Sequence, residues 1–392
     1  MARHFSVPAF FRLTPNALLK RYFSGRAVLQ DFDFENLPET RPQALMSKWL
    51  ALPDSVRGAM EADFRGIFDV SSERGYRAIL DEAKYHVAVD SEAYVALVEK
   101  LAALPGHADR AMTVFLDHHE MWRGVTRFSY ADSLPYWRKR RGLPAKKAAL
   151  DLDSRIALQS SVGAWFREKE GRGRNCLVEL LRRDERDYFF VYPEDFGSES
   201  MEWVNGEFSR RPHNPAFEVM YVWSEKEGVL DFHYRGGIAA VEPLQALFAK
   251  HVLKLDKLPP NPRDGRVYDL NPLKRREFQF VRPAGGGIDS VRVRLIRLSS
   301  TVRQGDRVTL EADVSENELA IYDVLEQVGR SLALNLWNVT RAEIVVHLSA
   351  RGDKPGRREV FTIGYPNACS LKHDDLGLKL RGMLAASGIE PK

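Results

Sequence analysis

Cysteine is almost absent from this sequence, because only Cys176 and Cys369 occur among its 392 residues. Two cysteines exclude a disulfide framework and a four-cysteine zinc site, and their scarcity is typical of a reducing compartment, so we expect a cytoplasmic protein. Long apolar runs are missing too, and none approaches the roughly 20 residues that a membrane-spanning helix needs. The sequence therefore predicts a folded protein without a membrane span.

Motifs of well-known catalytic chemistry are also missing. The sequence contains no Gly-x-Ser-x-Gly, no His-Glu-x-x-His, no Cys-x-x-Cys pair and no dinucleotide fingerprint between a strand and a helix. The glycine-rich residues 283–288 lack the Gly-Lys-Ser/Thr ending of a phosphate loop, and the residues after them alternate like a strand. These absences favour a binding protein over an enzyme, and we expect no cofactor.

Net charge is small, because 58 basic residues stand against 54 acidic ones and leave a formal charge of +4. Only 17 of the basic residues are lysines, which leaves 41 arginines. This bias is typical of a GC-rich coding genome, so we expect a bacterial protein. Guanidinium groups also suit phosphate binding, because they donate hydrogen bonds in a fixed planar fork. The total charge neither requires nor excludes a polyanionic partner.

What is present, from residue 216 onward, is one repeated construction: two alternating strands joined by a turn and followed by an amphipathic helix. Apolar residues at every second position predict the strands, and apolar residues at three- and four-residue spacing predict the helices. A further hairpin over 176–192 shows the same alternation. The three units are 217–234 with a helix over 241–255, 290–313 with a helix from about 319, and 342–364 with a helix after 374 or 375.

An isolated hairpin is marginally stable in water, so these strands must join a larger sheet that buries one face under helices. Residues before about 170 instead show helical periodicity. The sequence thus predicts the α+β class, with a helical N-terminal region followed by an antiparallel sheet of hairpin-plus-helix units and helices on one side. We expect a mainly helical domain over 1–150, hairpins plus a helix over 151–257, a proline-rich linker over 258–272 and a ββαββα domain over 273–392.

The sharpest cluster of metal-ligating residue types is Asp117-His118-His119-Glu120. On a helix, Asp117 and Glu120 share one face, while His119 falls on the apolar side. Asp-His-His is similar to the motif that names the DHH phosphoesterases, and this resemblance, which covers three residues, implies a manganese site. Packing or helix capping explains the same residues without a metal. Asp117, His119 and Glu120 are therefore the candidate metal ligands.

Two basic segments suggest contacts with phosphates. Residues 136–147 combine two aromatic side chains with six cations and no acid, and a solvated linker is the alternative explanation. Residues 263–307 hold eleven basic and five acidic residues, and alternation places Arg292 and Arg294 on the strand face away from Val291 and Val293. The predicted nucleic-acid-binding residues are Arg138, Lys139, Arg140, Arg141, Lys146, Lys147, Arg275, Arg276, Arg292 and Arg294.

A polar loop at residues 366–375 lies between a predicted strand and a predicted helix start. Backbone donors there could hold an anion beside Lys372 and His373. Capping of the next helix by Ser370 or Asp374 explains the same residue types without a ligand. Asn367, Ser370, Lys372 and His373 are the candidate anion-binding residues of this loop.

These patterns favour a non-catalytic cytoplasmic protein that contacts nucleic acid or another polyanion, in a role suited to a subunit of a larger bacterial assembly. One alternative is a module that binds a small molecule or a protein partner, with the ligand held between sheet and helices near Trp203, Trp223, Tyr234 and Trp337. The other is a metal-dependent phosphoesterase or hydrolase centred on Asp117, His119 and Glu120.

Overall fold

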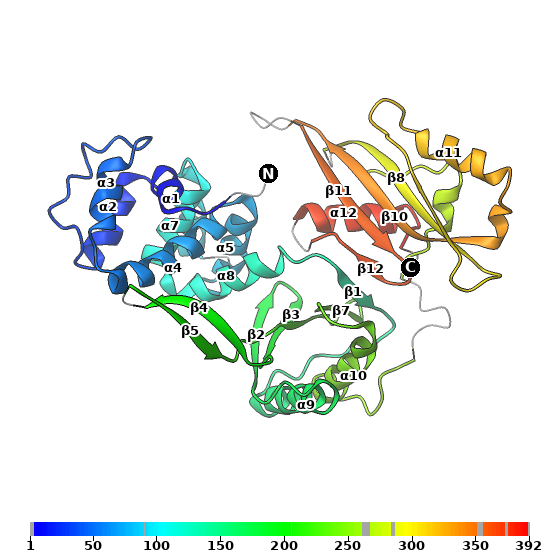
Figure 1. The fold of residues 1–392 in the computed structure, drawn as a ribbon, viewed down its shortest axis with the longest axis horizontal. Coiled ribbons are helices and arrows are strands. Elements are labelled where there is room, and N and C mark those ends of the chain that lie inside the picture. The colour runs from blue at the N-terminus through cyan, green and yellow to red at the C-terminus, as the bar shows by residue number, and fades with distance from the viewer. Residues whose placement is uncertain are drawn as a thin grey trace. The chain divides into compact units, whose positions relative to one another are not determined.

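The computed structural model describes residues 4–89, 91–204, 206–260, 267–283, 287–350, 356–372 and 375–390. They fall into two compact units, Met1–Ser133 with Met201–Ser209, and Leu134–Ser200 with Arg210–Lys392. Helices come first along the chain and strands follow, which confirms the predicted α+β class (Figure 1). No helix in the described ranges is both long and apolar enough to cross a bilayer.

The first unit is built from helices around an aromatic centre. Phe64 lies in the middle of it, with its ring centroid 4.4 Å from that of Phe10 and 5.2 Å from those of Tyr22 and Trp49. Aromatic side chains bury large areas, so they fix the N-terminal segment onto the unit. The helices are α1 (Val7–Leu13), α2 (Asn16–Gly25), α3 (Gln43–Leu50), α4 (Asp54–Val70), α5 (Glu73–His86), α6 (Glu92–Ala103), α7 (His107–Asp117) and α8 (Trp122–Ala131).

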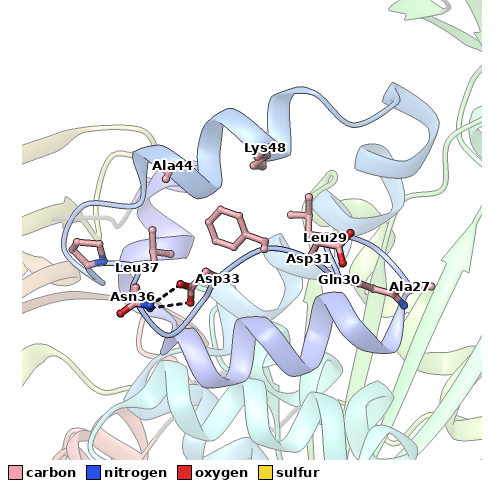
Figure 2. Close-up of a pocket in the computed structure, with 11 residues that line it drawn as sticks. Ala27, Leu29, Gln30, Asp31, Asp33, Asn36, Leu37, Ala44 and Lys48 are labelled. Carbon is pink, nitrogen blue, oxygen red and sulfur yellow. Dashed lines mark hydrogen bonds between the residues drawn. The ribbon is translucent and has the colours of Figure 1, made fainter.

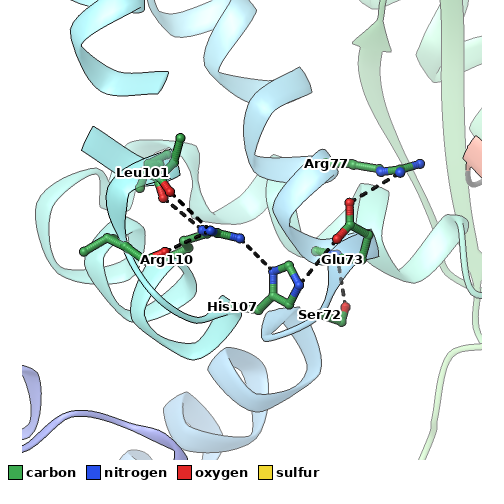
Figure 3. A network of polar contacts seen from close by, with 9 residues as sticks. Ser72, Glu73, Arg77, Leu101, His107 and Arg110 are labelled. Atoms are coloured by element: carbon green, nitrogen blue, oxygen red, sulfur yellow. Dashed lines mark hydrogen bonds and ion pairs between the residues drawn. The ribbon is translucent and has the colours of Figure 1, made fainter. Parts of the chain in front are cut away.

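A polar network joins three of these helices (Figure 3). Arg110 on α7 donates from Nε to the carbonyl of Leu101 at 2.9 Å, near the end of α6, where carbonyls lack helical partners. Its Nη1 lies 3.3 Å from His107 Nδ1, and His107 Nε2 lies 3.5 Å from Glu73 Oε2 on α5. The role of this polar network is therefore to hold α5, α6 and α7 together.

A ten-stranded antiparallel sheet forms the second unit, in the order β2-β3-β6-β7-β1-β12-β11-β10-β8-β9. The predicted hairpins are confirmed as the adjacent pairs β2–β3, β6–β7, β8–β9 and β10–β11. The strands are β1 (Trp137–Arg140), β2 (Cys176–Arg183), β3 (Arg186–Pro193), β6 (Val219–Ser224), β7 (Val229–Tyr234), β8 (Ile288–Ser300), β9 (Arg307–Glu311), β10 (Trp337–Leu348), β11 (Arg357–Gly364) and β12 (Ala368–Cys369).

Two helix pairs cover the sheet, and each pair encloses a separate hydrophobic core. The first core joins α9 (Leu152–Glu170) and α10 (Val241–His251) to β3, β6 and β7. The second joins α11 (Ala320–Gly329) and α12 (Asp375–Ala386) to β8, β10 and β11. Helix α9 ends at Gly171, a left-handed glycine cap with φ of 74°.

The two cores lie on opposite faces of the sheet. On β1, Trp137 lies opposite Cys369, which belongs to the second core, while Arg138 lies opposite Phe232, which belongs to the first. Consecutive strand residues point to opposite faces, so the cores do as well. The expectation of helices on one side only was wrong, because alternation within one hairpin does not reveal which face its neighbours bury.

Two further segments have structure that the sequence did not predict. Strands β4 (Ser198–Val204) and β5 (Glu207–His213) form a separate two-stranded sheet, and their polar pattern gave no strand signal. Residues 267–273, at the end of the predicted proline-rich linker, pack into the second core through Tyr268 and Leu270. Residues 261–266 of that linker lie outside the described ranges.

Candidate nucleic-acid interface

The basic residues 138–141 mark the seam where β1 joins the two halves of the sheet (Figure 1). Lys139 donates to Glu390 Oε1 at 2.9 Å, and Arg141 forms an ion pair with the same carboxylate. Arg140 is buried, and it donates to a side-chain amide on α10 at 3.1 Å. Burial lowers the pKa of Arg140. These three cations therefore have partners inside the protein.

Three of the other predicted cations have acidic partners, and three others lie on the surface. Lys146 and Lys147 are exposed, and Arg275 is exposed as well. Three arginines are paired: Arg276 with Asp323 at 2.8 Å and Glu326 at 3.0 Å, Arg292 with Glu318 at 2.6 Å, and Arg294 with Glu343 at 2.7 Å and Glu311 at 3.4 Å. Their charge is largely offset within the protein.

A different set of arginines lies side by side on the face of the sheet opposite the second core. Arg341 on β10 lies directly opposite Arg297 on β8. Arg307 on β9 lies opposite Ser299, two residues further along β8 on the same face. The structure thus brings together three arginines from three neighbouring strands.

Arg138, one of the predicted residues, falls in the same cross-strand row. From Arg138 the row passes through Ala368 on β12 and Gly364 on β11 to Arg341. Strands lie about 4.8 Å apart, so Arg138 and Arg341 flank a strip of small residues roughly 14 Å wide. We call Arg138, Arg297, Arg307 and Arg341 the arginine face.

Repulsion between like charges is the unusual property of this face. Arg297, Arg307 and Arg341 form no ion pair with an acidic residue in the part of the chain that the structure describes. Burial, and then the positive charges of Arg307 and Arg341, lower the pKa of Arg297. Like charges directly opposite each other destabilise a sheet. An anion placed between these guanidinium groups would remove that cost.

Two β-bulges direct the side chains of this face. The pairing of β8 with β10 skips Arg294 and Thr340, so each is an extra residue on its strand. Beyond Arg294 the alternation of β8 shifts by one residue, so Ile296 enters the second core and Arg297 points to the opposite face. Bulges are often found where a side chain next to a functional site is redirected.

A polar hollow of about 370 Å³ opens beside the arginine face. The hydroxyls of Ser299 and Thr340 lie 2.8 Å apart in its wall, and Arg297 Nε is 3.4 Å from Thr340 Oγ1. The hollow and the guanidinium groups therefore meet at these two hydroxyls. The lining residues are Asp269, Leu270, Asn271, Ser299, Ser300, Thr301, Asn338, Val339, Thr340 and Tyr365.

No protein-family model matches this chain, and a search of curated proteins finds no match either. Function is therefore inferred from the arginine face and its hollow. Arg341 was missed in the sequence, although alternation along β10 turns it away from the buried Ala342. Arg297 and Arg307 were noticed only as part of a basic segment. Strand pairing, which no local pattern reveals, is what places the three together.

The polar loop at residues 366–372 is held within the sheet. Ser370 Oγ accepts a hydrogen bond from the backbone N–H of Thr362 at 2.8 Å, and the carbonyl of Asn367 accepts one from Lys139 N at 3.4 Å. Lys372 is half-buried, and His373 lies outside the described residues. The hydroxyl of Ser370 thus already has a backbone partner.

The predicted metal ligands do not converge in the structure. Asp117 forms ion pairs with Arg21 and, at 3.0 Å, with Lys100. Burial by itself raises the pKa of Asp117, but the hydrogen bonds from these two cations outweigh it, so the net pKa is lower than normal. His119 and Glu120 are exposed. Among the described residues, no group of three metal-ligating side chains comes together.

A second hollow, of about 710 Å³, lies in the first unit between α2 and α3 (Figure 2). Asp33 in its wall accepts hydrogen bonds from the Asn36 side chain at 2.6 Å and backbone at 3.2 Å, and these bonds lower its pKa. The carboxylate therefore holds its own turn, an arrangement typical of loops. The hollow offers few other charged groups, namely Asp31 and Lys48.

The tryptophans considered for a small-molecule site belong to three different strands. Trp223 belongs to the first core together with Tyr234, whereas Trp337 packs against the second. Trp203, on β4, is 75% exposed. Within the second unit, Trp223 and Trp337 therefore belong to separate cores and do not share one aromatic pocket.

Replacing Arg341 by threonine should raise the free energy of unfolding by about 0.2–1 kcal/mol at low salt, because it removes a like-charge pair from the sheet. The gain should shrink at high salt, since salt screens the repulsion. Urea unfolding at two ionic strengths measures both effects. The matched change Arg294→Thr removes an arginine with acidic partners and should destabilise. Equal destabilisation by both changes would contradict the repulsion.

Proposed function

We propose that this protein binds nucleic acid, without catalysing a reaction, through the arginine face. The supporting observation is that Arg341 lies opposite Arg297 with no acidic partner for either among the described residues. Such an arrangement costs stability in the free protein, and natural sequences commonly accept that cost where function requires it. Scarce cysteine and the arginine bias support a bacterial cytoplasmic protein.

A polymer fits this face better than a single small anion. From β1 to β9 the arginine face crosses five strand spacings, or about 24 Å at about 4.8 Å each. A nucleic-acid strand carries one charge about every 3.4 Å along the duplex axis, so several phosphates fit across this span. The strip formed by Gly364 and Ala368 leaves room for a chain to lie close to the sheet.

The test replaces Arg297, Arg307 and Arg341 together by glutamine and measures the anisotropy of a labelled single-stranded oligonucleotide over a salt series. Each phosphate contact contributes about 0.7 to the slope of log affinity against log salt, so the slope should decrease by about 2. At moderate salt the affinity should fall on the order of 10- to 100-fold.

The control removes the same charge from arginines that already have acidic partners. Arg186, Arg210 and Arg276 pair with Glu227, with Glu199, and with Asp323 and Glu326. Their triple glutamine variant should keep most of the affinity and the slope. An equal loss in both triple variants would show that only net charge matters, and it would overturn the proposal.

A further inference from the structure

We infer that the hollow beside the arginine face, together with Arg297, Arg307 and Arg341, binds the phosphorylated end of a nucleic-acid strand. This inference rests on the proposed function and specifies which part of the nucleic acid the site recognises. Arg138, across the Gly364 and Ala368 strip, would then contact phosphates further along the strand.

Charge balance favours an end over an internal position. A phosphodiester inside a strand carries one negative charge, which can neutralise only one of the opposed pair Arg297 and Arg341. A terminal phosphomonoester carries about 1.5–2 negative charges at pH 7 and three acceptor oxygens. It can therefore offset both opposed guanidinium groups, and it also attracts Arg307 beside them.

The hydroxyl pair sits where such a phosphate needs further donors. Thr340 Oγ1 lies 3.4 Å from Arg297 Nε and 2.8 Å from Ser299 Oγ. Hydroxyls rotate to donate to an anion, and arginine supplies two parallel donors. Because Thr340 is the extra residue of a bulge, its side chain belongs to this site without disturbing the core of the sheet.

Residues 269–271 close the hollow on one side, as expected for a site that binds the end of a nucleic-acid strand. Asn271 Oδ1 accepts from the backbone N–H of Val339 at 3.1 Å, and Asn271 Nδ2 donates to Asn338 Oδ1 at 3.2 Å. These bonds join the segment to β10. A chain entering over the arginine face therefore meets a wall at this point.

The lining of the hollow matches the chemistry of a nucleoside. Asn338 provides an amide that can pair with base or sugar groups, and the ring of Tyr365, 45% exposed overall, can stack on a base. A volume of about 370 Å³ lies at the lower end of the range for small-ligand sites, which suits one nucleotide.

The experiment compares unlabelled oligonucleotides of one sequence as competitors. One carries a 5′-phosphate, one a 3′-phosphate and one hydroxyls at both ends, because the two ends share the same phosphomonoester chemistry. We expect one phosphorylated form to compete about tenfold better than the hydroxyl form, since one extra charge-assisted contact contributes about that factor. The better competitor identifies the end that is bound.

Two variants place the effect in the hollow. Asn338→Trp, at an exposed position, fills the hollow, and Thr340→Val removes the hydroxyl while keeping the shape. In both, the ratio of affinities between phosphorylated and hydroxyl ends should fall toward one, while Arg276→Gln should keep it. Urea unfolding of each variant confirms that it is folded.

The outcomes separate the two claims. If no oligonucleotide binds the wild-type protein, the proposed function fails and this inference fails with it. If all three competitors bind equally, the protein binds nucleic acid but the end-binding site is wrong. If the preference exists but survives in both hollow variants, the end is bound elsewhere and the assignment to the hollow is overturned.

Discussion

Replacing Glu390 by alanine should lower the free energy of unfolding by about 3–5 kcal/mol, because it leaves buried cations without their counter-charge. The Glu390 side chain is only 3% exposed, and it accepts from Lys139, which is 13% exposed, and from Arg141. The buried Arg381 on α12 also interacts electrostatically with this carboxylate. Glu390 therefore pairs with two cations at the seam of the sheet and, together with Asp231, acts on a third.

Urea unfolding of the purified full chain measures this loss of stability. Two further variants serve as comparisons. Glu390→Gln keeps hydrogen-bond acceptors but removes the charge, so it should lie between alanine and wild type. Glu326→Ala breaks an exposed ion pair with Arg276 and should cost at most about 1 kcal/mol. A Glu390→Ala loss no larger than this control would mean that the seam does not depend on the carboxylate.

Lowering the pH from 7.5 to 4 should destabilise the wild-type protein by about 3 kcal/mol more than a His233→Gln variant. His233 on β7 is 4% exposed. Burial, and then the charge of Arg235, lowers its pKa from 6.5 to about 4. The unfolded chain therefore binds the proton more readily than the folded protein. This contribution to stability is complete above about pH 6.5 and is lost as the pH falls toward 4.

The measurement is the free energy of unfolding of both proteins at several pH values, with the difference plotted against pH. Asp and Glu residues titrate in both proteins alike, so the difference isolates His233. His213→Gln, a change of an exposed histidine on β5, should leave the profile unchanged. A difference that stays flat between pH 7.5 and 4 would show that His233 is not held neutral in the fold.

Glu390 and His233, the two residues on which these stability predictions depend, both lie near β1, the strand that joins the two halves of the sheet. Trp137 on β1 has its ring centroid 5.4 Å from that of His233, and Lys139 two residues later bonds to Glu390. The same strand carries Arg138 on its other face. Stability of the seam and the position of Arg138 relative to Arg341 therefore depend on the same short strand.

The basic segment at residues 138–141 shows why local composition is a poor guide to an interface. Four consecutive cations suggest an open patch, but alternation along a strand sends Lys139 to one face and Arg138 and Arg140 to the other. Partners from distant parts of the chain then bind three of these side chains, Gln245 binding Arg140 and Glu390 binding Lys139 and Arg141. Such partners are separated by over a hundred residues, so no sequence window contains them.

The sequence by itself determined four hairpins of the second unit and the helices that cover them, because alternation and helical spacing are local properties of neighbouring residues. It could not determine the candidate site. A regular strand would turn Arg297 toward the same face as Val293 and hence toward the core. The bulge at Arg294 turns Arg297 to the other face, and the pairing with β10 then places Arg341 opposite Arg297. Bulges and strand order arise from packing between distant segments, so only the tertiary structure decided which arginines meet.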